Sequence, residues 1–120
     1  MLLDSYDESD FDDILDERDE EYFSDVWMNN YNEVEKITKE KSIDKSFSNM
    51  IREKSFKIIL EKTQNSDLAS YISDDFGLLC DAIDVKFNSG WLKALWCEYQ
   101  NNKIPNGKLR SIKGNLIEPC

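Results

Sequence analysis

The chain contains no histidine, and this one absence excludes several classes of enzyme. Without an imidazole there can be no Ser-His-Asp or Cys-His nucleophile, no histidine general base and no HExxH zinc site. The sequence also lacks a Walker phosphate loop and a GxGxxG dinucleotide fingerprint. We therefore predict that the protein is not an enzyme and that it has no catalytic residues, no cofactor and no metal site.

Glycine and proline are also scarce, at 4 and 2 of 120 residues. An all-β fold needs turn residues between its strands, so this shortage favours helices. The length is that of one domain. We predict a mainly α-helical protein, a compact bundle of about four to six helices in a single domain over residues 1–120.

Long apolar runs are missing as well, and none approaches the roughly 18 residues that a membrane-spanning helix needs. The first ten residues, MLLDSYDESD, lack the basic region that begins a signal peptide. Cysteine is odd in number, and no pair has C-x-x-C spacing. We expect Cys80, Cys97 and Cys120 to be reduced thiols of a cytoplasmic protein that does not bind membranes.

Apolar residues recur at steps of three and four along most of the chain, which is typical of amphipathic helices. This spacing predicts helices over residues 10–24, continuing through 21–40, and over 43–62, 67–87 and 91–102. We expect a break near Asn29-Asn30. The run SFKIIL, residues 55–60, fits a short strand as well as a helix.

Three serines are candidate helix N-caps, because a serine hydroxyl can accept a hydrogen bond from the first helical turn: Ser42, Ser66 and Ser73. Ser73 would begin a second helix after the one at Asp67, with Asp74-Asp75 in its first turn. We expect the buried stripe of that helix to be Phe76, Leu79, Cys80, Ile83 and Phe87.

All of the net charge of −10 comes from the first 25 residues. They hold 12 of the 25 Asp and Glu residues with Arg18 as their one basic residue, and so carry −11. The other residues hold 13 acidic and 14 basic side chains, and so carry +1. So local a block of charge is typical of an interaction surface or a solvated tail.

Apolar residues within this acidic block favour a docked helix over a tail: Phe11, Ile14, Leu15, Tyr22 and Phe23. Carboxylates at i, i+4 spacing repel each other, so the helix should form only if its apolar stripe is covered. We therefore expect residues 1–25 to be an acidic segment with a partly docked helix. A solvated, partly disordered tail is the alternative.

The C-terminal residues 103–120, KIPNGKLRSIKGNLIEPC, form a basic and weakly patterned tail. This tail can pair as a short hairpin, stay flexible, or reach back to the acidic segment. We expect no nucleic-acid binding, because the net charge has the wrong sign for phosphate contacts. The mixed stretch EKITKEKSIDK, residues 35–45, alternates in sign and is not a basic stripe.

We predict that the carboxylates of the acidic segment contact a basic protein. A rigid charged surface steers association and loses little entropy on binding. Tyr22 and Trp27 are candidate aromatic anchors. The predicted partner-binding residues are Asp10, Asp12, Asp13, Asp16, Glu17, Asp19, Glu20, Glu21, Tyr22 and Trp27.

Two stretches carry a resemblance to a known type of protein. They are the acidic block of residues 7–25 and DLASYISDDFGLLCDAIDVKFNSGWLKALWCEYQNNKIP, residues 67–105, together about half of the chain. A small, acidic, histidine-free, helical chain of this kind resembles bacterial immunity proteins that neutralise nuclease toxins, including those of contact-dependent growth inhibition and the colicins. The resemblance implies a tight one-to-one complex in the cytoplasm with a cognate toxin. This toxin would be a basic protein with nuclease activity.

Two other functions stay open at this point. A DNA mimic of the anti-restriction or anti-CRISPR type would also use carboxylates, but it should spread them over most of its surface, because duplex DNA carries a charge about every 1.7 Å of its axis. An enzyme that uses only Asp and Glu is the third reading, and it would need a pocket lined by carboxylates with perturbed pKa values.

Overall fold

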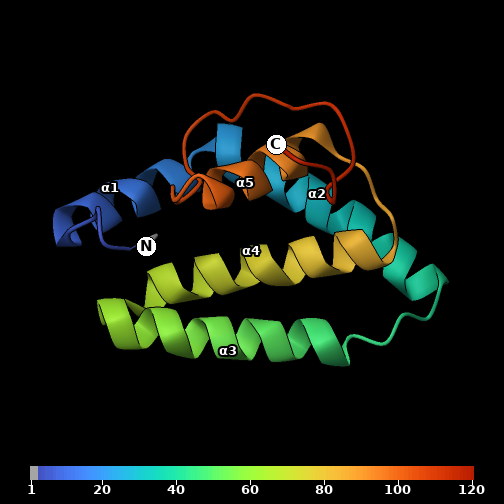
Figure 1. Ribbon diagram of the computed structural model, residues 1–120, viewed down its shortest axis with the longest axis horizontal. Helices are drawn as coiled ribbons and strands as arrows, with labels where there is room; N and C mark the ends of the chain where they lie inside the picture. Colours follow the sequence, from blue (N-terminus) through green and yellow to red (C-terminus); the bar gives the residue numbers. More distant parts are fainter. Residues whose placement is uncertain (1–2) are drawn as a thin grey trace. The chain divides into compact units, whose positions relative to one another are not determined.

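The computed structural model describes residues 3–120, over which it contains five α-helices and no β-strand. The helices are α1 (Glu8–Asp19), α2 (Glu21–Glu40), α3 (Ser46–Thr63), α4 (Ser66–Asp84) and α5 (Gly90–Gln100) (Figure 1). The prediction of a mainly helical fold with four to six helices is confirmed. Within residues 3–120, no helix combines the length and the apolar character that crossing a bilayer requires.

The contacts within the chain group into two compact units. Of the described residues, unit 1 contains 3–31 and 88–120, and so holds α1, the first part of α2, α5 and the C-terminal residues. Unit 2 contains residues 32–87, which form the rest of α2, α3 and α4. The boundary falls inside α2, and the single domain expected over residues 1–120 stays a prediction.

Unit 2 contains an αα-hairpin, in which α3 and α4 lie side by side (Figure 1). Gln64 ends α3 in the left-handed region, at φ 56°. The side chain of Asn65 then accepts a hydrogen bond from the backbone N–H of Leu68 and so caps α4. This two-residue connection turns the chain back at once, which makes the two helices antiparallel neighbours.

The close approach of α3 to α4 depends on a glycine. A Cβ atom at Gly77 would lie 2.3 Å from Cδ of Arg52, so only glycine leaves room for the arginine side chain to cross α4. Arg52 then pairs with Asp74, with 2.9 Å between Nη2 and Oδ1. Asp74, which the sequence predicts in the first turn of a helix, therefore lies in the middle of α4.

The core of unit 1 includes α5, most of whose side chains are buried. Ser89 caps this helix by accepting a hydrogen bond from the N–H of Leu92, as its serine hydroxyl suits it to do. The ring of Phe23 meets that of Trp91 edge-on, with 5.1 Å between centroids. This aromatic pair ties α2 to α5.

Two helix boundaries predicted in the first half of the chain are wrong, and the run SFKIIL, left open between strand and helix, is helical. The first break comes at Glu20, whose ψ of 149° is extended, and not at Asn29-Asn30, which lie inside α2. SFKIIL lies inside α3 and is not a strand. Ser42 has a positive φ of 51° in the loop before α3 and caps no helix.

The expected division of residues 67–87 into two helices is also wrong, because α4 runs without interruption through Ser73. The Ser73 hydroxyl donates a hydrogen bond to the carbonyl of Ser70 and is buried. Of the predicted stripe only Leu79 is buried, while Ile83 is exposed. The apolar face that α4 buries is instead Leu68, Ala69, Ile72, Leu78, Leu79 and Ala82.

The C-terminal residues 101–120 contain neither strand nor helix, so the short hairpin does not form. They run beside α5 (Figure 1) and are joined to it by a hydrogen bond of 3.0 Å from the N–H of Ile112 to the carbonyl of Gly90. Leu116 is buried at 4% exposure. The tail is therefore packed onto unit 1.

The expectation of three reduced thiols is wrong, because Cys97 and Cys120 form a disulfide. The two residues are 23 positions apart, and no spacing rule marked them as a pair. Only the return of the tail along α5 brings them together. Cys80 is the one free cysteine; its burial and the neighbouring carboxylates of Asp81 and Asp84 raise its pKa, so this thiol is poorly reactive.

Candidate functional site

The acidic segment begins with a reciprocal cap on α1. The side chain of Asp7 accepts a hydrogen bond of 3.0 Å from the N–H of Asp10, and the Asp10 carboxylate accepts one of 2.9 Å from the N–H of Asp7. The Ser9 hydroxyl also donates to Asp7, at 2.7 Å. These hydrogen bonds, that of Ser9 first, lower the pKa of Asp7, because they favour the charged carboxylate.

One side of α1 is buried at helical spacing, with Phe11 and Ile14 at 6% and 5% exposure. An acidic helix is therefore held in place by an apolar stripe, as its self-repulsion requires. Residues 8–19 are therefore a docked helix and not a solvated tail. Leu15 is half-buried, so it belongs to the edge of the same stripe.

Arg18 is the third buried residue of α1, at 5% exposure, and sequence reasoning missed its role. Its guanidinium carbon lies 4.5 Å from the centre of the Phe23 ring. Its Nη1 donates a hydrogen bond of 3.3 Å to the carbonyl of Pro105. The only cation of the acidic block is therefore withdrawn from the surface. Its isolation among carboxylates was the signal that could have found it.

The exposed carboxylates of this region form what we name the acidic surface: Asp12, Asp13, Asp16, Glu17, Asp19, Glu20 and Glu21. Asp12 and Asp16, like Asp13 and Glu17, are one turn apart on α1. Glu20 lies just past the end of α1 and Glu21 begins α2, so the expected straight rows bend at that point. Asp10 is only half-exposed, and its carboxylate is used in the cap.

Tyr22 lies at the edge of the acidic surface and is half-buried. Its hydroxyl donates a hydrogen bond to Oε2 of Glu17. This bond, with smaller contributions from burial and from the charges of Glu17 and Glu20, raises the pKa of Tyr22 to about 12. The Nζ atom of Lys108 lies 5.6 Å from the centre of the Tyr22 ring. The tail thus reaches back to the acidic segment.

Trp27, the second predicted anchor, lies one and a half turns further along α2. Its ring stacks on that of Tyr31, with 5.4 Å between centroids and an interplanar angle of 13°. Both residues are half-buried. The pair presents part of its aromatic surface to solvent, as an interface anchor would.

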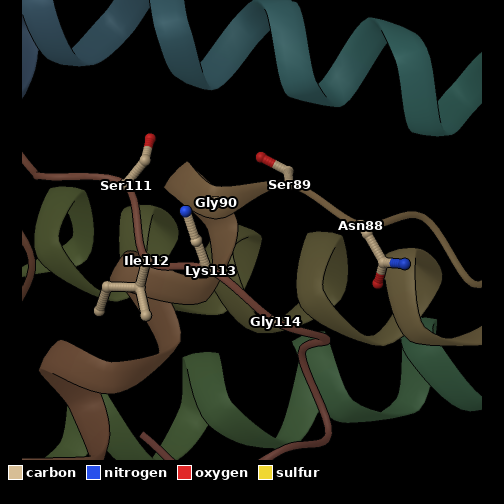
Figure 2. A pocket seen from close by; sticks show the side chains of 7 residues that line it. All are labelled: Asn88, Ser89, Gly90, Ser111, Ile112, Lys113 and Gly114. Atoms are coloured by element: carbon tan, nitrogen blue, oxygen red, sulfur yellow. The ribbon is translucent and has the colours of Figure 1, made fainter.

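A cavity of about 420 Å³ lies elsewhere in unit 1, between the N-terminal end of α5 and the C-terminal tail (Figure 2). Its lining includes Ser89, Ser111 and Lys113, whose side chains Figure 2 shows on the same side of the α5 end. The Ser89 hydroxyl is already used as the helix cap. Within residues 3–120, no three Cys, Asp or Glu side chains are grouped so that they could hold a metal ion.

Comparison with protein families decides between the classes of function that this geometry allows. A family model described as Immunity protein PIM1 matches residues 2–106, nearly the whole chain. The chain belongs to this family. It is therefore an immunity protein, which binds a cognate toxin, rather than an enzyme. No curated protein matches the chain in sequence.

Proposed function

We propose that this immunity protein neutralises a bacterial nuclease toxin in the cytoplasm by placing its acidic surface in the basic active-site groove of the toxin. The toxin would be of the contact-dependent growth inhibition or colicin type. One observation carries the proposal: seven carboxylates are exposed on a helix that is docked through its apolar side, and on the turn that follows it. The complex would contain one copy of each protein.

The charge of the acidic surface is available to a partner. Asp12, Asp13 and Asp16 make no ion pair with any described residue, and Arg18 is buried beneath them. A nuclease groove is basic because it holds phosphates, so carboxylates can take the same positions. The order of α1 supports tight binding, because little conformational entropy is lost when a rigid helix binds.

The confinement of this charge supports a toxin over a long nucleic-acid-binding groove. Residues 1–25 carry −11, while the rest of the chain carries +1. A DNA mimic would present phosphate-like charge over a longer path. One compact acidic surface fits one active site.

The test compares two triple variants with the same change in net charge. Asp12→Lys, Asp16→Lys and Glu20→Lys reverse the acidic surface, whereas Glu33→Lys, Glu40→Lys and Glu61→Lys reverse three exposed carboxylates of unit 2. The cognate toxin is first isolated by pull-down from host lysate with a salt gradient and identified by mass spectrometry. Affinity is then measured by calorimetry and neutralisation by a DNA and RNA degradation assay.

We expect the first triple variant to weaken binding at least 100-fold, because several charge pairs become repulsive at once, and to abolish neutralisation. The second should bind within about threefold of the parent, since charges outside the proposed interface act only through the screened net field. Equal losses in both variants would show that net charge alone matters. Unchanged affinity in the first variant would remove the acidic surface from the interface. A toxin without nuclease activity would contradict the proposed target.

A further inference from the structure

The last 14 residues of the chain, 107–120, lie beyond the range that matches the family. We name them the C-terminal arm. The arm carries three exposed cations, Lys108, Arg110 and Lys113, and one anion, Glu118. It therefore brings a net charge of +2 into a unit whose other end is strongly acidic.

The arm is fixed at both ends: it follows a buried anchor, turns at a hinge, Gly107, and ends at a latch, the Cys97–Cys120 disulfide. Ile104 and Pro105 are buried just before it, and the N–H of Ile104 donates a hydrogen bond of 3.0 Å to the Tyr6 hydroxyl. Gly107 follows with a φ of 72°, which suits glycine, so the chain can turn there. At the far end, Cys120 is bonded to Cys97 of α5.

Few other contacts hold the arm between the hinge and the latch. Ile112 donates to the carbonyl of Gly90, and Nζ of the buried Lys93 donates a hydrogen bond of 3.0 Å to the carbonyl of Asn115. Leu116 is its one buried apolar side chain. A segment with no helix or strand and so few buried contacts belongs to the least stable part of a fold.

The start of the arm lies against the acidic surface. A Cβ atom at Gly107 would be 4.0 Å from Oε2 of Glu17, and Lys108 lies over the Tyr22 ring, whose hydroxyl is bonded to the same Glu17. A cation of the arm is thereby held where a basic partner would approach. The arm therefore places one positive charge beside Glu17 and partly neutralises that end of the acidic surface, whose carboxylates stay exposed.

We propose that the Cys97–Cys120 disulfide is a reversible latch, which holds the arm against the acidic surface when oxidised and releases it when reduced. The biological meaning of the latch rests on the function proposed above, since a reducing cytoplasm would then remove the positive charge of the arm from the acidic surface before the toxin binds. The opening itself can be measured without any toxin.

The chemistry of release is thiol–disulfide exchange with a dithiol. A thiolate of the dithiol attacks the sulfur of Cys120, which is exposed, whereas Cys97 is 4% exposed. Cys97 leaves as a thiolate and takes up a proton. The second thiol of the reagent then displaces Cys120, so the protein gains two thiols and the dithiol becomes a disulfide.

Trypsin reports the opening, because Lys108, Arg110 and Lys113 supply cleavage sites in the arm. Cleavage of the full-length chain is followed by mass spectrometry with and without dithiothreitol. We expect reduction to speed cleavage in the arm by roughly tenfold or more, since the cross-link no longer limits opening, while circular dichroism of the helices stays unchanged. Cys120→Ser should be cleaved rapidly in both conditions, and Cys80→Ser should behave like the parent.

Oligolysine serves as a basic probe of the acidic surface at low salt. We expect reduction to tighten its binding about fivefold, and Cys120→Ser to bind it tightly with or without reductant, because Lys108 no longer competes. Equal arm cleavage in both redox states would overturn the latch. Faster cleavage without tighter oligolysine binding would overturn the partial neutralisation of the acidic surface by the arm. A toxin that binds without contacting the acidic surface would contradict the proposed function. It would change neither the arm cleavage nor the oligolysine binding.

Discussion

The two units treat their charged side chains in opposite ways. Unit 2 holds 11 acidic and 9 basic residues and pairs them locally: Glu53 with Lys57, Asp74 with Arg52, and Glu35 with Lys45. Unit 1 holds 14 acidic and 6 basic residues and separates them by element. Its carboxylates lie on α1 and the turn after it, while most of its cations lie in and near the C-terminal arm.

This difference supports the proposal that the toxin binds to unit 1. The mixed charges of unit 2 nearly cancel, and the ion pairs on its surface contribute little to stability or to attraction at a distance. Charges gathered by sign in unit 1 keep a field that can steer a partner. Under the proposed function, this field would speed the association of the acidic surface with a basic toxin.

The largest expected effect is the loss of stability on replacing Arg18, the one arginine of α1. The comparison is the loss on replacing Arg52 of unit 2. Arg18→Ala should lower the free energy of unfolding by about 3 kcal/mol, because it empties a buried site and removes the hydrogen bond to Pro105. Arg52→Ala should lower it by about 1 kcal/mol or less, since Arg52 and Asp74 are a half-exposed pair.

Urea denaturation followed by circular dichroism measures both values. Equal losses would show that burial of Arg18 does not set unit 1 apart from unit 2.

A smaller effect is expected within unit 2, at the crossing of α3 and α4. Gly77→Ala should destabilise the protein by about 1–2 kcal/mol, because the new methyl group meets the Arg52 side chain. In an Arg52→Ala background the same change should instead stabilise by up to about 1 kcal/mol, because alanine is the better helix former. The double-mutant cycle is read by thermal and urea unfolding. A loss of the same size in both backgrounds would show that the new methyl group clashes with backbone atoms and not with the Arg52 side chain.

The smallest effect sharpens the description of the acidic surface. Glu17→Gln should bring the pKa of Tyr22 from about 12 back toward its ordinary value of 10, because its largest cause is the hydrogen bond to Glu17. The pKa is raised on folding, so this contribution to stability is present below about pH 10 and is lost as the pH rises through 12.

Absorbance of tyrosinate near 295 nm follows this titration, and Tyr22→Phe identifies the group. An unchanged high-pH titration in Glu17→Gln would assign the shift to burial.

Helical content could be predicted well, because it depends on residue spacing that is visible in the chain. The steps of Phe11, Ile14 and Arg18 mark the covered side of α1, although the sequence alone marked Arg18 only as the one basic residue of the acidic block. Helix ends were harder. Ser73 and the two aspartates after it look like a helix start, yet they lie in mid-helix, where Ser73 is buried and Asp74 pairs with Arg52 of another helix.

The candidate site divides in the same way. Exposure of the predicted carboxylates followed from the pattern, apart from Asp10, which the cap half-buries. Trp27 stays a predicted anchor, and the stacking of its ring on Tyr31 could not be read from the sequence. The neighbours of Tyr22 could not be predicted, because Lys108 is 86 residues away along the chain and reaches it only through the return of the tail.

The sequence by itself determined that this protein is helical, that it lacks the usual catalytic groups, and that its negative charge is concentrated in one segment. These properties depend on composition and local spacing, which tertiary structure does not alter. Only the tertiary structure decided that Arg18 is buried, that Cys97 meets Cys120 and that a basic arm lies against the acidic surface. Each of these depends on contacts between residues far apart in the chain, and such contacts are set by how the apolar faces pack together.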